Sequence, residues 1–449
     1  MIDRPLKLDQ RTQTSGAPTA VRSILSPPRT TLVERFLLVT SIILLPLQNN
    51  FAVAGVSLMF LVYGALAAYV IVNRLRILGE TWCHPVFIAC YAFVVVSVLL
   101  EYSSPLSSFS EISRFAQMTG GAVCVAVLCR DRSALSAGMY AYIATAMWLS
   151  VVLYSTGYGA LQEVQADNFH QASGVRSKTF EDRPVEANLN TMAFLCAQGA
   201  IVAFALSLSC RLKYLRSLLL GIAGFCLIAA FLPMSRGVVM ASAVCAATIL
   251  YAHGAKQGKA LILAAILGMG IYLLVPDAVW SRMAFSTDVG ASGKMEARAY
   301  IYTAALNRLP EYILSGVGAG NFMNKWGAEK GFMRGGVVLG AHNAFLQITI
   351  FWGVLSLSMF VWIIWCVYRS VPLHCGRDQL ALALVGILVS LGLSLMQGHG
   401  FYSKSNALGI GMLVGARLWI WPRGIVSAVE VNRCPSAGDI NISPDCHSR

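Results

Sequence analysis

Charged residues are scarce in this chain. Only 12% of its 449 residues are Asp, Glu, Lys or Arg, whereas 57% are hydrophobic. This composition is typical of membrane proteins and excludes a soluble multidomain protein. The formal net charge is +13, but the basic residues stand in short runs at the ends of apolar segments, where they anchor helices and set topology. We therefore expect no nucleic-acid partner.

Several motifs are also missing. The twelve cysteines form no CxxC pair, which argues against a zinc site or a disulfide framework. Residues 1–31 contain no apolar core of signal-peptide length, so they are expected to form a disordered cytoplasmic tail. The polar loops hold no glycosidase-like carboxylate pair, metal cluster or nucleophile elbow. A metal-independent transfer reaction without a cofactor is the chemistry that remains.

The chain does contain many long apolar runs. A bilayer-spanning helix needs about 20 mostly apolar residues, and about a dozen runs approach that length. They fall near residues 32–48, 51–72, 85–100, 115–129, 137–157, 190–210, 217–232, 237–252, 259–275, 342–367, 379–397 and 404–421. The sequence therefore predicts an all-α integral membrane protein with about 12 transmembrane helices. Residues 32–421 would form one polytopic membrane domain, and residues 422–449 a cytoplasmic tail.

The orientation follows from the positions of Lys and Arg in the short loops, because these residues resist translocation. Loops that contain them alternate with loops nearly free of basic charge. The basic loops include those with Arg74, Arg130, Arg211, Lys256 and Arg369. Both termini are thus predicted to be cytoplasmic, and the longer loops 158–189 and 276–341 to face outward. No cysteine lies in an outward loop on this topology.

The outward loop 276–341 and its surroundings hold the main candidates for chemistry. Arg236 follows a short turn at an apolar boundary, and Arg298 precedes a segment with helical spacing of apolar residues. Each is either an interfacial or surface charge or an anion clamp, since guanidinium matches phosphate oxygens in a bidentate way. His342 closes the loop and is either a structural hydrogen bonder or a base. One base and two cations suit displacement of a diphosphate leaving group by a hydroxyl.

Further residues on the outward side are candidates for substrate binding. Gly318 and Gly320 permit close backbone approach to a ligand, although their spacing alone is a weak phosphate motif. Arg183 and Asn190 lie near the start of the sixth run, where they could reach a headgroup or sugar. Lys404 lies in the last outward loop, where an interfacial anchor is the competing interpretation. Asn343 follows the histidine directly.

Five segments give the chain a resemblance to a known family. They are Ser235-Arg236-Gly237 at a turn, Glu296-Ala297-Arg298, Ser315 to Phe322, Ala341 to Leu346 and Trp352 to Leu355. With these motifs the sequence resembles the O-antigen ligase and polymerase superfamily of bacterial membrane glycosyltransferases. The resemblance is specific over roughly residues 190–370 and implies a C-type glycosyltransferase-like fold, with a large periplasmic catalytic loop at 276–341.

The resemblance also implies a reaction. The donor would be a glycan on undecaprenyl diphosphate in the bacterial inner membrane, held through Arg236 and Arg298. His342 would activate the acceptor hydroxyl, and the anomeric configuration would invert without metal or nucleotide. Ligases of this group use lipid A-core as the acceptor, and polymerases use the next lipid-linked repeat. The order Arg, Arg, His favours the ligase, with the polymerase as the alternative and a chain-length regulator as a further partner.

Two other function classes remain open. A flippase or transporter can also have about twelve spans, but such proteins place ionisable residues or broken helices near the bilayer midplane. Here the spans hold almost no charge, so transport ranks below transfer. A noncatalytic subunit of a polysaccharide export complex, bound through the basic tails, is the third class.

Overall fold

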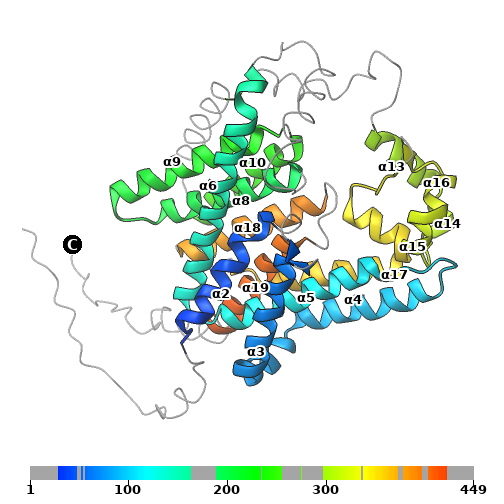
Figure 1. The fold of residues 1–449 in the computed structure, drawn as a ribbon, viewed down its shortest axis with the longest axis horizontal. Helices are drawn as coiled ribbons and strands as arrows, with labels where there is room; N and C mark the ends of the chain where they lie inside the picture. Colours follow the sequence, from blue (N-terminus) through cyan, green and yellow to red (C-terminus); the bar gives the residue numbers. More distant parts are fainter. Residues whose placement is uncertain are drawn as a thin grey trace, which may run out of the picture.

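The computed structural model describes residues 29–47, 52–53, 56–162, 189–233, 235–254, 275, 297–334, 337–372, 378–396 and 403–421. Several predictions fall outside these residues: the tail before residue 29, all but the last residue of the apolar run 259–275, Arg183, most of the loop before residue 297, and the tail after residue 421. The described part is almost entirely α-helical (Figure 1).

Eleven helices of the described part overlap predicted apolar runs. They are α2 (Leu32–Ile43), α3 (Leu58–Trp82), α4 (Pro85–Tyr102), α5 (Ser110–Leu128), α6 (Arg132–Gln162), α8 (Leu189–Leu208), α9 (Lys213–Phe231), α10 (Arg236–Ala252), α17 (Ala344–Ser370), α18 (Gln379–Leu395) and α19 (Lys404–Trp419). Six of them are long and apolar enough to cross a bilayer: α3, α4, α6, α8, α9 and α17. The multi-pass helical fold is therefore confirmed, while the total of twelve spans stays a prediction.

The second predicted run is misplaced. We expected a helix over 51–72, but β1 (Ala52–Val53) and β2 (Val56–Ser57) form a short antiparallel hairpin there. The helix α3 begins only at Leu58 and continues to Trp82. A short apolar strand has the same kind of composition as part of an apolar helix. The start of α3 could therefore not be predicted from the sequence.

Helix α8 is the centre of one half of the bundle. It is apolar on every side, and 78% of its most apolar stretch of 18 residues is buried. This is expected for a helix without a polar face. It packs against α6, α9, α10 and α18. A second buried cluster joins α4, α5 and α17 to a unit formed by residues 297–334 and 337–338, which lies at the ends of α4 and α17 in Figure 1. The candidate site belongs to this second half.

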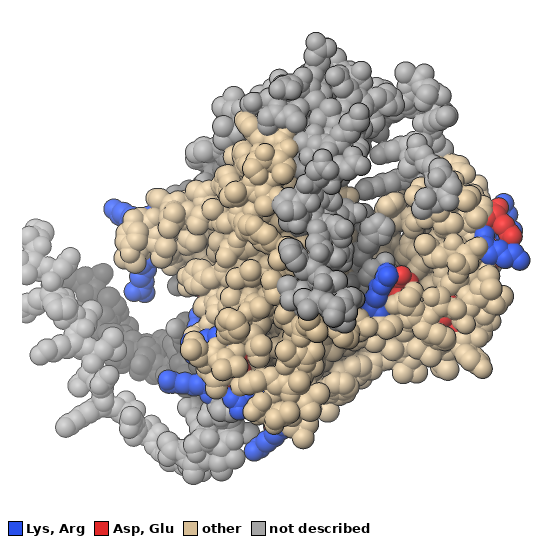
Figure 2. Space-filling model, viewed as in Figure 1, with Lys and Arg blue, Asp and Glu red and all other residues tan. Residues whose placement is uncertain are grey.

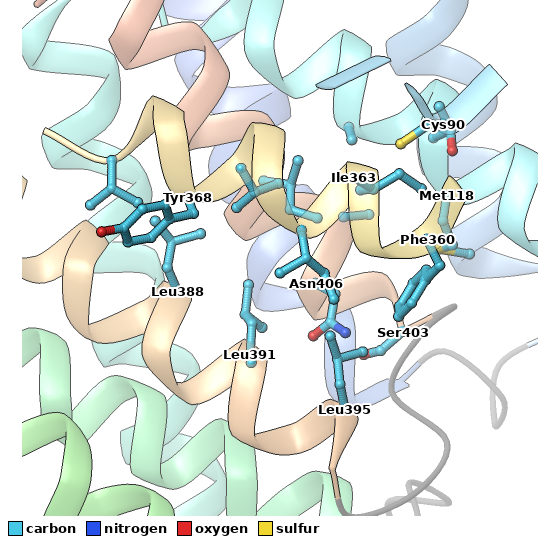
Figure 3. A pocket seen from close by; sticks show the side chains of 18 of the residues that line it. Cys90, Met118, Phe360, Ile363, Tyr368, Leu388, Leu391, Leu395, Ser403 and Asn406 are labelled. Atoms are coloured by element: carbon cyan, nitrogen blue, oxygen red, sulfur yellow. The ribbon is translucent and has the colours of Figure 1, made fainter. Parts of the chain in front are cut away.

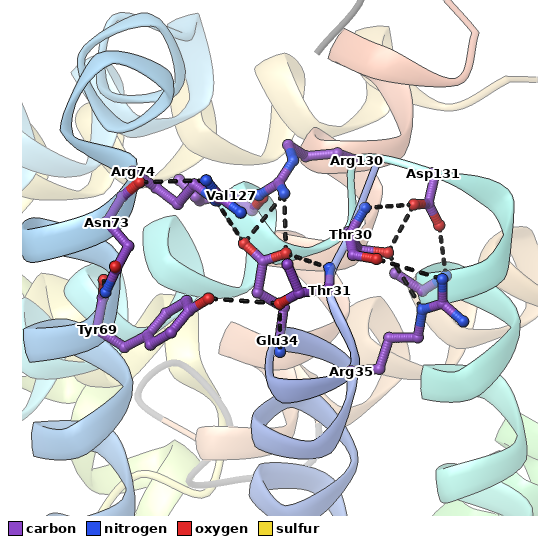
Figure 4. Close-up of polar contacts among 11 residues, drawn as sticks. Thr30, Thr31, Glu34, Arg35, Tyr69, Asn73, Arg74, Val127, Arg130 and Asp131 are labelled. Atoms are coloured by element: carbon purple, nitrogen blue, oxygen red, sulfur yellow. Dashed lines mark hydrogen bonds and ion pairs between the residues drawn. The ribbon is translucent and has the colours of Figure 1, made fainter. Parts of the chain in front are cut away.

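Three of the loops that we predicted to share the cytoplasmic side meet at a buried carboxylate (Figure 4). Glu34 near the start of α2 accepts from Arg74 Nε at 2.6 Å and from Arg130 Nη2 at 2.9 Å. The Glu34 and Arg130 side chains are fully buried. Close by, Thr30 donates through its N–H and its hydroxyl to Asp131 Oδ2. Arg74 and Arg130 therefore neutralise Glu34 and hold the start of α2 in place.

Helix α17 is broken, although its sequence predicts one span over 342–367. Trp352 and Gly353 have non-helical backbone angles, with φ +69° and ψ −171° at Gly353. The rings of Phe345 and Phe360 lie only 5.7 Å apart, whereas fifteen residues of straight helix would separate them by about 22 Å. The first half of α17 therefore folds back toward the second half, and its N-terminus lies level with Phe360.

Gly353 is required at this break. Its backbone conformation is essentially confined to glycine, and a Cβ there would lie 2.2 Å from the Leu314 carbonyl oxygen. We expect Gly353→Ala to lower the free energy of unfolding by about 2–3 kcal/mol, seen as a lower thermal midpoint of the purified protein. Gly64→Ala is the control, because Gly64 is an exposed helical glycine with open space around it. An unchanged midpoint in Gly353→Ala would contradict the glycine requirement.

Candidate functional site

The site is built on a small unit at the ends of α4 and α17. Its elements are α13 (Ala297–Asn307), α14 (Leu309–Tyr312), α15 (Ala319–Asn321), the π-helical turn η2 (Phe322–Trp326), α16 (Gly327–Glu329), and the hairpin of β3 (Met333–Arg334) with β4 (Val337–Val338). Phe322 lies at its centre, in ring contact with Trp326, Phe332 and Phe351. This aromatic core fastens the unit to the first half of α17.

The glycine-spaced turn joins this unit to the break in α17. Val317 N–H donates to the Ile350 carbonyl at 2.9 Å, and Gly318 N–H to the Phe351 carbonyl at 2.8 Å. In return, Val354 N–H donates to the Ile313 carbonyl at 2.7 Å. The carbonyls freed where the helix breaks are thus satisfied by the turn, as buried backbone groups require.

Glu101, the penultimate residue of α4, holds the turn from the other side. Its Oε2 accepts from Ala319 N–H at 2.7 Å and from Trp352 Nε1–H at 2.8 Å. Its Oε1 accepts from Ser108 N–H at 2.7 Å and from Gly320 N–H at 3.0 Å. All four partners are donors. Together they satisfy both side-chain oxygens of Glu101, which is fully buried.

This arrangement gives Gly318 and Gly320 a structural role that the sequence did not predict. A Cβ on Gly318 would lie 2.2 Å from Ser104 Oγ, and one on Gly320 would lie 2.2 Å from the Leu106 carbonyl oxygen. The close approach that they permit is thus to the segment between α4 and α5, and both N–H groups are already bonded within the protein. Their role in substrate binding stays a prediction. It cannot use the N–H groups of Gly318 and Gly320, because both are bonded within the protein.

His342 lies in the bend that leads into the first half of α17. It has φ +50°, the left-handed region that few residues other than glycine adopt. On one side Ala341 N–H donates to Gln347 Oε1. On the other side Asn343 caps the helix, because its Oδ1 accepts from Phe345 N–H at 3.0 Å and from Leu346 N–H at 3.2 Å. The histidine is half-buried and is held in an uncommon conformation, as residues at functional sites often are.

The two predicted arginines begin helices. Arg236 is the first residue of α10, and Arg298 is the second residue of α13. Their backbones are placed, but their side chains lie outside the described part. The convergence of Arg236, Arg298 and His342 therefore stays a prediction.

The other predicted binding residues also lie at helix starts. Asn190 is the second residue of α8 and Lys404 the first of α19, and both are half-buried. Asn343 uses its side-chain oxygen as a cap, so its amide nitrogen is the group left to meet a substrate. These roles stay predictions.

Three other charges of the unit are paired with each other. Arg308 Nη1 lies 3.0 Å from Glu311 Oε1, and Lys330 Nζ lies 3.5 Å from Glu311 Oε2. The hydrogen bond from Arg308 lowers the pKa of Glu311, and the charge of Lys330 acts in the same direction. Figure 2 shows blue and red atoms together at the outer edge of this unit. Arg308 and Lys330 therefore stabilise the surface of the unit through Glu311.

Sequence reasoning missed Glu101 and Gln347. Glu101 stands at the end of an apolar run and is followed by Tyr102, Ser103, Ser104 and Pro105. A single carboxylate at the end of an apolar run was the available signal, since a charge there is retained only when it is paired or hydrogen-bonded. Gln347 carries no comparable signal within its apolar run.

The described residues contain no group of three His, Cys, Asp or Glu side chains arranged to hold a metal ion. One comparison with known proteins gives a match: residues 221–361 fit a family model described as O-antigen ligase. The matched segment begins within α9 and ends within the second half of α17. No curated protein matches the chain.

Proposed function

From the match of residues 221–361 to the O-antigen ligase family model, we propose that the protein is a glycosyltransferase of the O-antigen ligase type. It moves a glycan from undecaprenyl diphosphate to a hydroxyl of lipid A-core, at the periplasmic face of the bacterial inner membrane. The observation that carries the proposal is the extent of the match, which includes Arg236, Arg298 and His342 together.

The proposed reaction is a direct displacement. His342 takes the proton of the acceptor hydroxyl, whose oxygen attacks the anomeric carbon of the glycan. The bond between that carbon and the diphosphate oxygen breaks, so the configuration inverts and undecaprenyl diphosphate leaves. Arg236 and Arg298 hold the diphosphate and stabilise the charge that develops on it. Neither a metal nor a nucleotide takes part.

The fixed geometry around His342 supports this role. A base works best when its orientation is set before the substrate arrives. The Gln347 bond to Ala341 and the Asn343 cap fix the backbone on either side of the histidine. Glu101 and the glycine turn fix the break at the far end of the same half-helix. The loop 276–341 is proposed to complete the site over the donor.

The proposal is tested in the host that lacks this gene. Lipid-linked and surface glycans are separated by gel and identified by mass spectrometry, with the wild-type gene restored as the control. A ligase is expected to leave long chains on the lipid carrier and a bare lipid A-core. A pool that contains only single repeats, on carrier or core, identifies the polymerase instead. Unchanged pools would contradict both assignments.

A flippase requires a different measurement. The purified protein is placed in vesicles with a lipid-linked glycan donor and an acceptor, and both glycosidic bond formation and movement of the donor between leaflets are followed. Bond formation is the expected result. Movement of the donor without bond formation would replace the transferase by a flippase.

A further inference from the structure

The corner between α8 and α9 carries three basic side chains within six residues. We define this α8–α9 corner as residues 210–218. Arg211, Lys213 and Arg216 in it are all exposed. In Figure 2, blue atoms stand at the upper left edge, where α8 and α9 meet in Figure 1, and no red atoms lie beside them. The α8–α9 corner is therefore a positively charged surface.

The charge of this corner is not neutralised within the described part of the chain. Residues 189–254 contain no Asp or Glu, and no ion pair between described residues includes any of the three basic side chains. Basic residues of two other helices are paired, Arg76 with Glu80 and Arg132 with Asp378. Like charges close together repel one another, so a bound anion would stabilise the α8–α9 corner.

The direction of α9 adds to this excess of positive charge. Lys213 is the first residue of α9 and Arg216 the fourth, so both lie in its first turn. The N-terminal end of a helix carries a partial positive charge, which disfavours cations and favours anions nearby. An anion at the α8–α9 corner would therefore interact favourably with the basic side chains and with the helix dipole at once.

Exposed apolar side chains beside the cations indicate that the anion belongs to a lipid. Leu212, Tyr214 and Leu218 are 52%, 73% and 56% exposed, and the last two lie four residues apart on one face of α9. α9 is long and apolar enough to cross a bilayer. Tyrosine is enriched at the membrane–water interface, and Lys and Arg extend from apolar surfaces toward the headgroups. The phosphate of a membrane lipid is thus the nearest anion to this corner.

The cavity in Figure 3 is no alternative site for such a headgroup. It has a volume of about 360 Å³, begins at Phe360 on α17 and lies between α4, α5, α17, α18 and α19. Its lining is mostly aliphatic and aromatic and contains no Asp, Glu, Lys or Arg. A phosphate is bound by cations and N–H donors, and of these two places the α8–α9 corner has the cations.

From these observations we infer that the α8–α9 corner binds the headgroup of an anionic phospholipid, of which phosphatidylglycerol is the probe used below. Arg211, Lys213 and Arg216 bind its phosphate, and Tyr214 and Leu218 contact the upper part of its acyl chains. On the topology predicted from the basic loops, the lipid lies in the cytoplasmic leaflet, where basic segments beside a span are attracted to anionic lipids. This site is separate from glycan transfer and does not depend on the proposed function.

The test measures the affinity of single lipids for the purified full-length protein by native mass spectrometry. The wild type should bind phosphatidylglycerol more tightly than phosphatidylcholine, and higher ionic strength should reduce the difference. The triple variant Arg211→Gln, Lys213→Gln, Arg216→Gln should bind phosphatidylglycerol at least about fivefold more weakly, the effect of losing one cation at a membrane surface. Equal wild-type affinity for the two lipids, or wild-type affinity in the triple variant, would overturn the inference.

A matched control removes the same charge from arginines that have partners. The control variant is Arg76→Gln, Arg114→Gln, Arg132→Gln, since each of these arginines pairs with a carboxylate. It should keep wild-type affinity for phosphatidylglycerol, and thermal midpoints establish that both variants fold. An equal loss of affinity in the control would assign the preference to net charge and overturn the inference.

Photo-crosslinking of the wild-type protein gives an outcome that does not depend on any variant. Phosphatidylglycerol with a diazirine next to its headgroup should label residues 210–218, and phosphatidylcholine with the same group should label them at least about fivefold less. Inorganic phosphate, which has no acyl chains, should not prevent the labelling. Labelling confined to other segments would overturn the inference, and so would competition by inorganic phosphate at the concentration at which unlabelled phosphatidylglycerol competes.

Discussion

His342→Asn is expected to lower the rate of glycan transfer by about 10²–10⁴-fold, the usual contribution of a general base. Asparagine is chosen because His342 has φ +50°, a conformation that asparagine adopts more readily than alanine. The variant thus removes the imidazole and retains the backbone. The rate is measured with purified protein, lipid-linked donor and acceptor, across a range of pH. Any residual activity should lose the fall in rate that protonation of a catalytic histidine causes at low pH.

His84, at the N-terminal end of α4, provides a matched control. His84 caps that helix, with Nδ1 accepting from Val86 N–H at 3.3 Å, and asparagine is itself a good N-cap. His84→Asn should therefore retain wild-type transfer and stability. If His342→Asn also keeps more than about a tenth of the rate, His342 is not the base.

Glu101→Gln is expected to cost about 2–6 kcal/mol in the free energy of unfolding, because two buried N–H groups each lose an acceptor at about 1–3 kcal/mol. The amide nitrogen of glutamine cannot accept from any of the four donors that now contact the carboxylate. The variant should show a lower thermal midpoint. Where it still folds, transfer should fall, because the turn and the break in α17 lose their common anchor.

Glu80→Gln is the control. It tests whether the loss of any carboxylate near a helix end lowers the free energy of unfolding. Glu80 pairs with Arg76 at 3.7 Å, and the two side chains are 52% and 84% exposed. Exposed pairs of this kind contribute about 0–1 kcal/mol, so this control should unfold close to the wild type. Equal midpoints for Glu101→Gln and Glu80→Gln would contradict the anchoring role of Glu101.

Most helix positions could be predicted from the sequence. The run at 85–100 corresponds to α4 and the run at 237–252 to α10, because crossing a bilayer demands an uninterrupted apolar segment of fixed length. The prediction failed at residues 51–57, where a two-stranded hairpin is as apolar as a helix. It also failed at Trp352 and Gly353, because neither residue interrupts the apolar run in which the helix breaks.

The residues of the candidate site could be predicted from the sequence better than their arrangement in space. A histidine and an arginine at the ends of apolar runs, with a second arginine in the loop between those runs, indicate anion chemistry by their type and position. The glycine turn looked like a surface for a ligand, but its N–H groups are bonded to Glu101 and to the break in α17. Those partners come from elsewhere in the chain, so the spacing of the glycines could not distinguish the two uses.

The sequence by itself determined that this protein is a multi-pass helical membrane protein, since hydrophobic length and composition decide that before any packing occurs. It also determined the family resemblance, through short motifs that need no partner to be recognised. Only the tertiary structure decided that Glu101 anchors the turn, that α17 folds back to bring His342 level with Phe360, and that an apolar cavity begins there. These features depend on contacts between residues far apart in the chain, and a buried polar group or a broken helix is stable only where such contacts satisfy it.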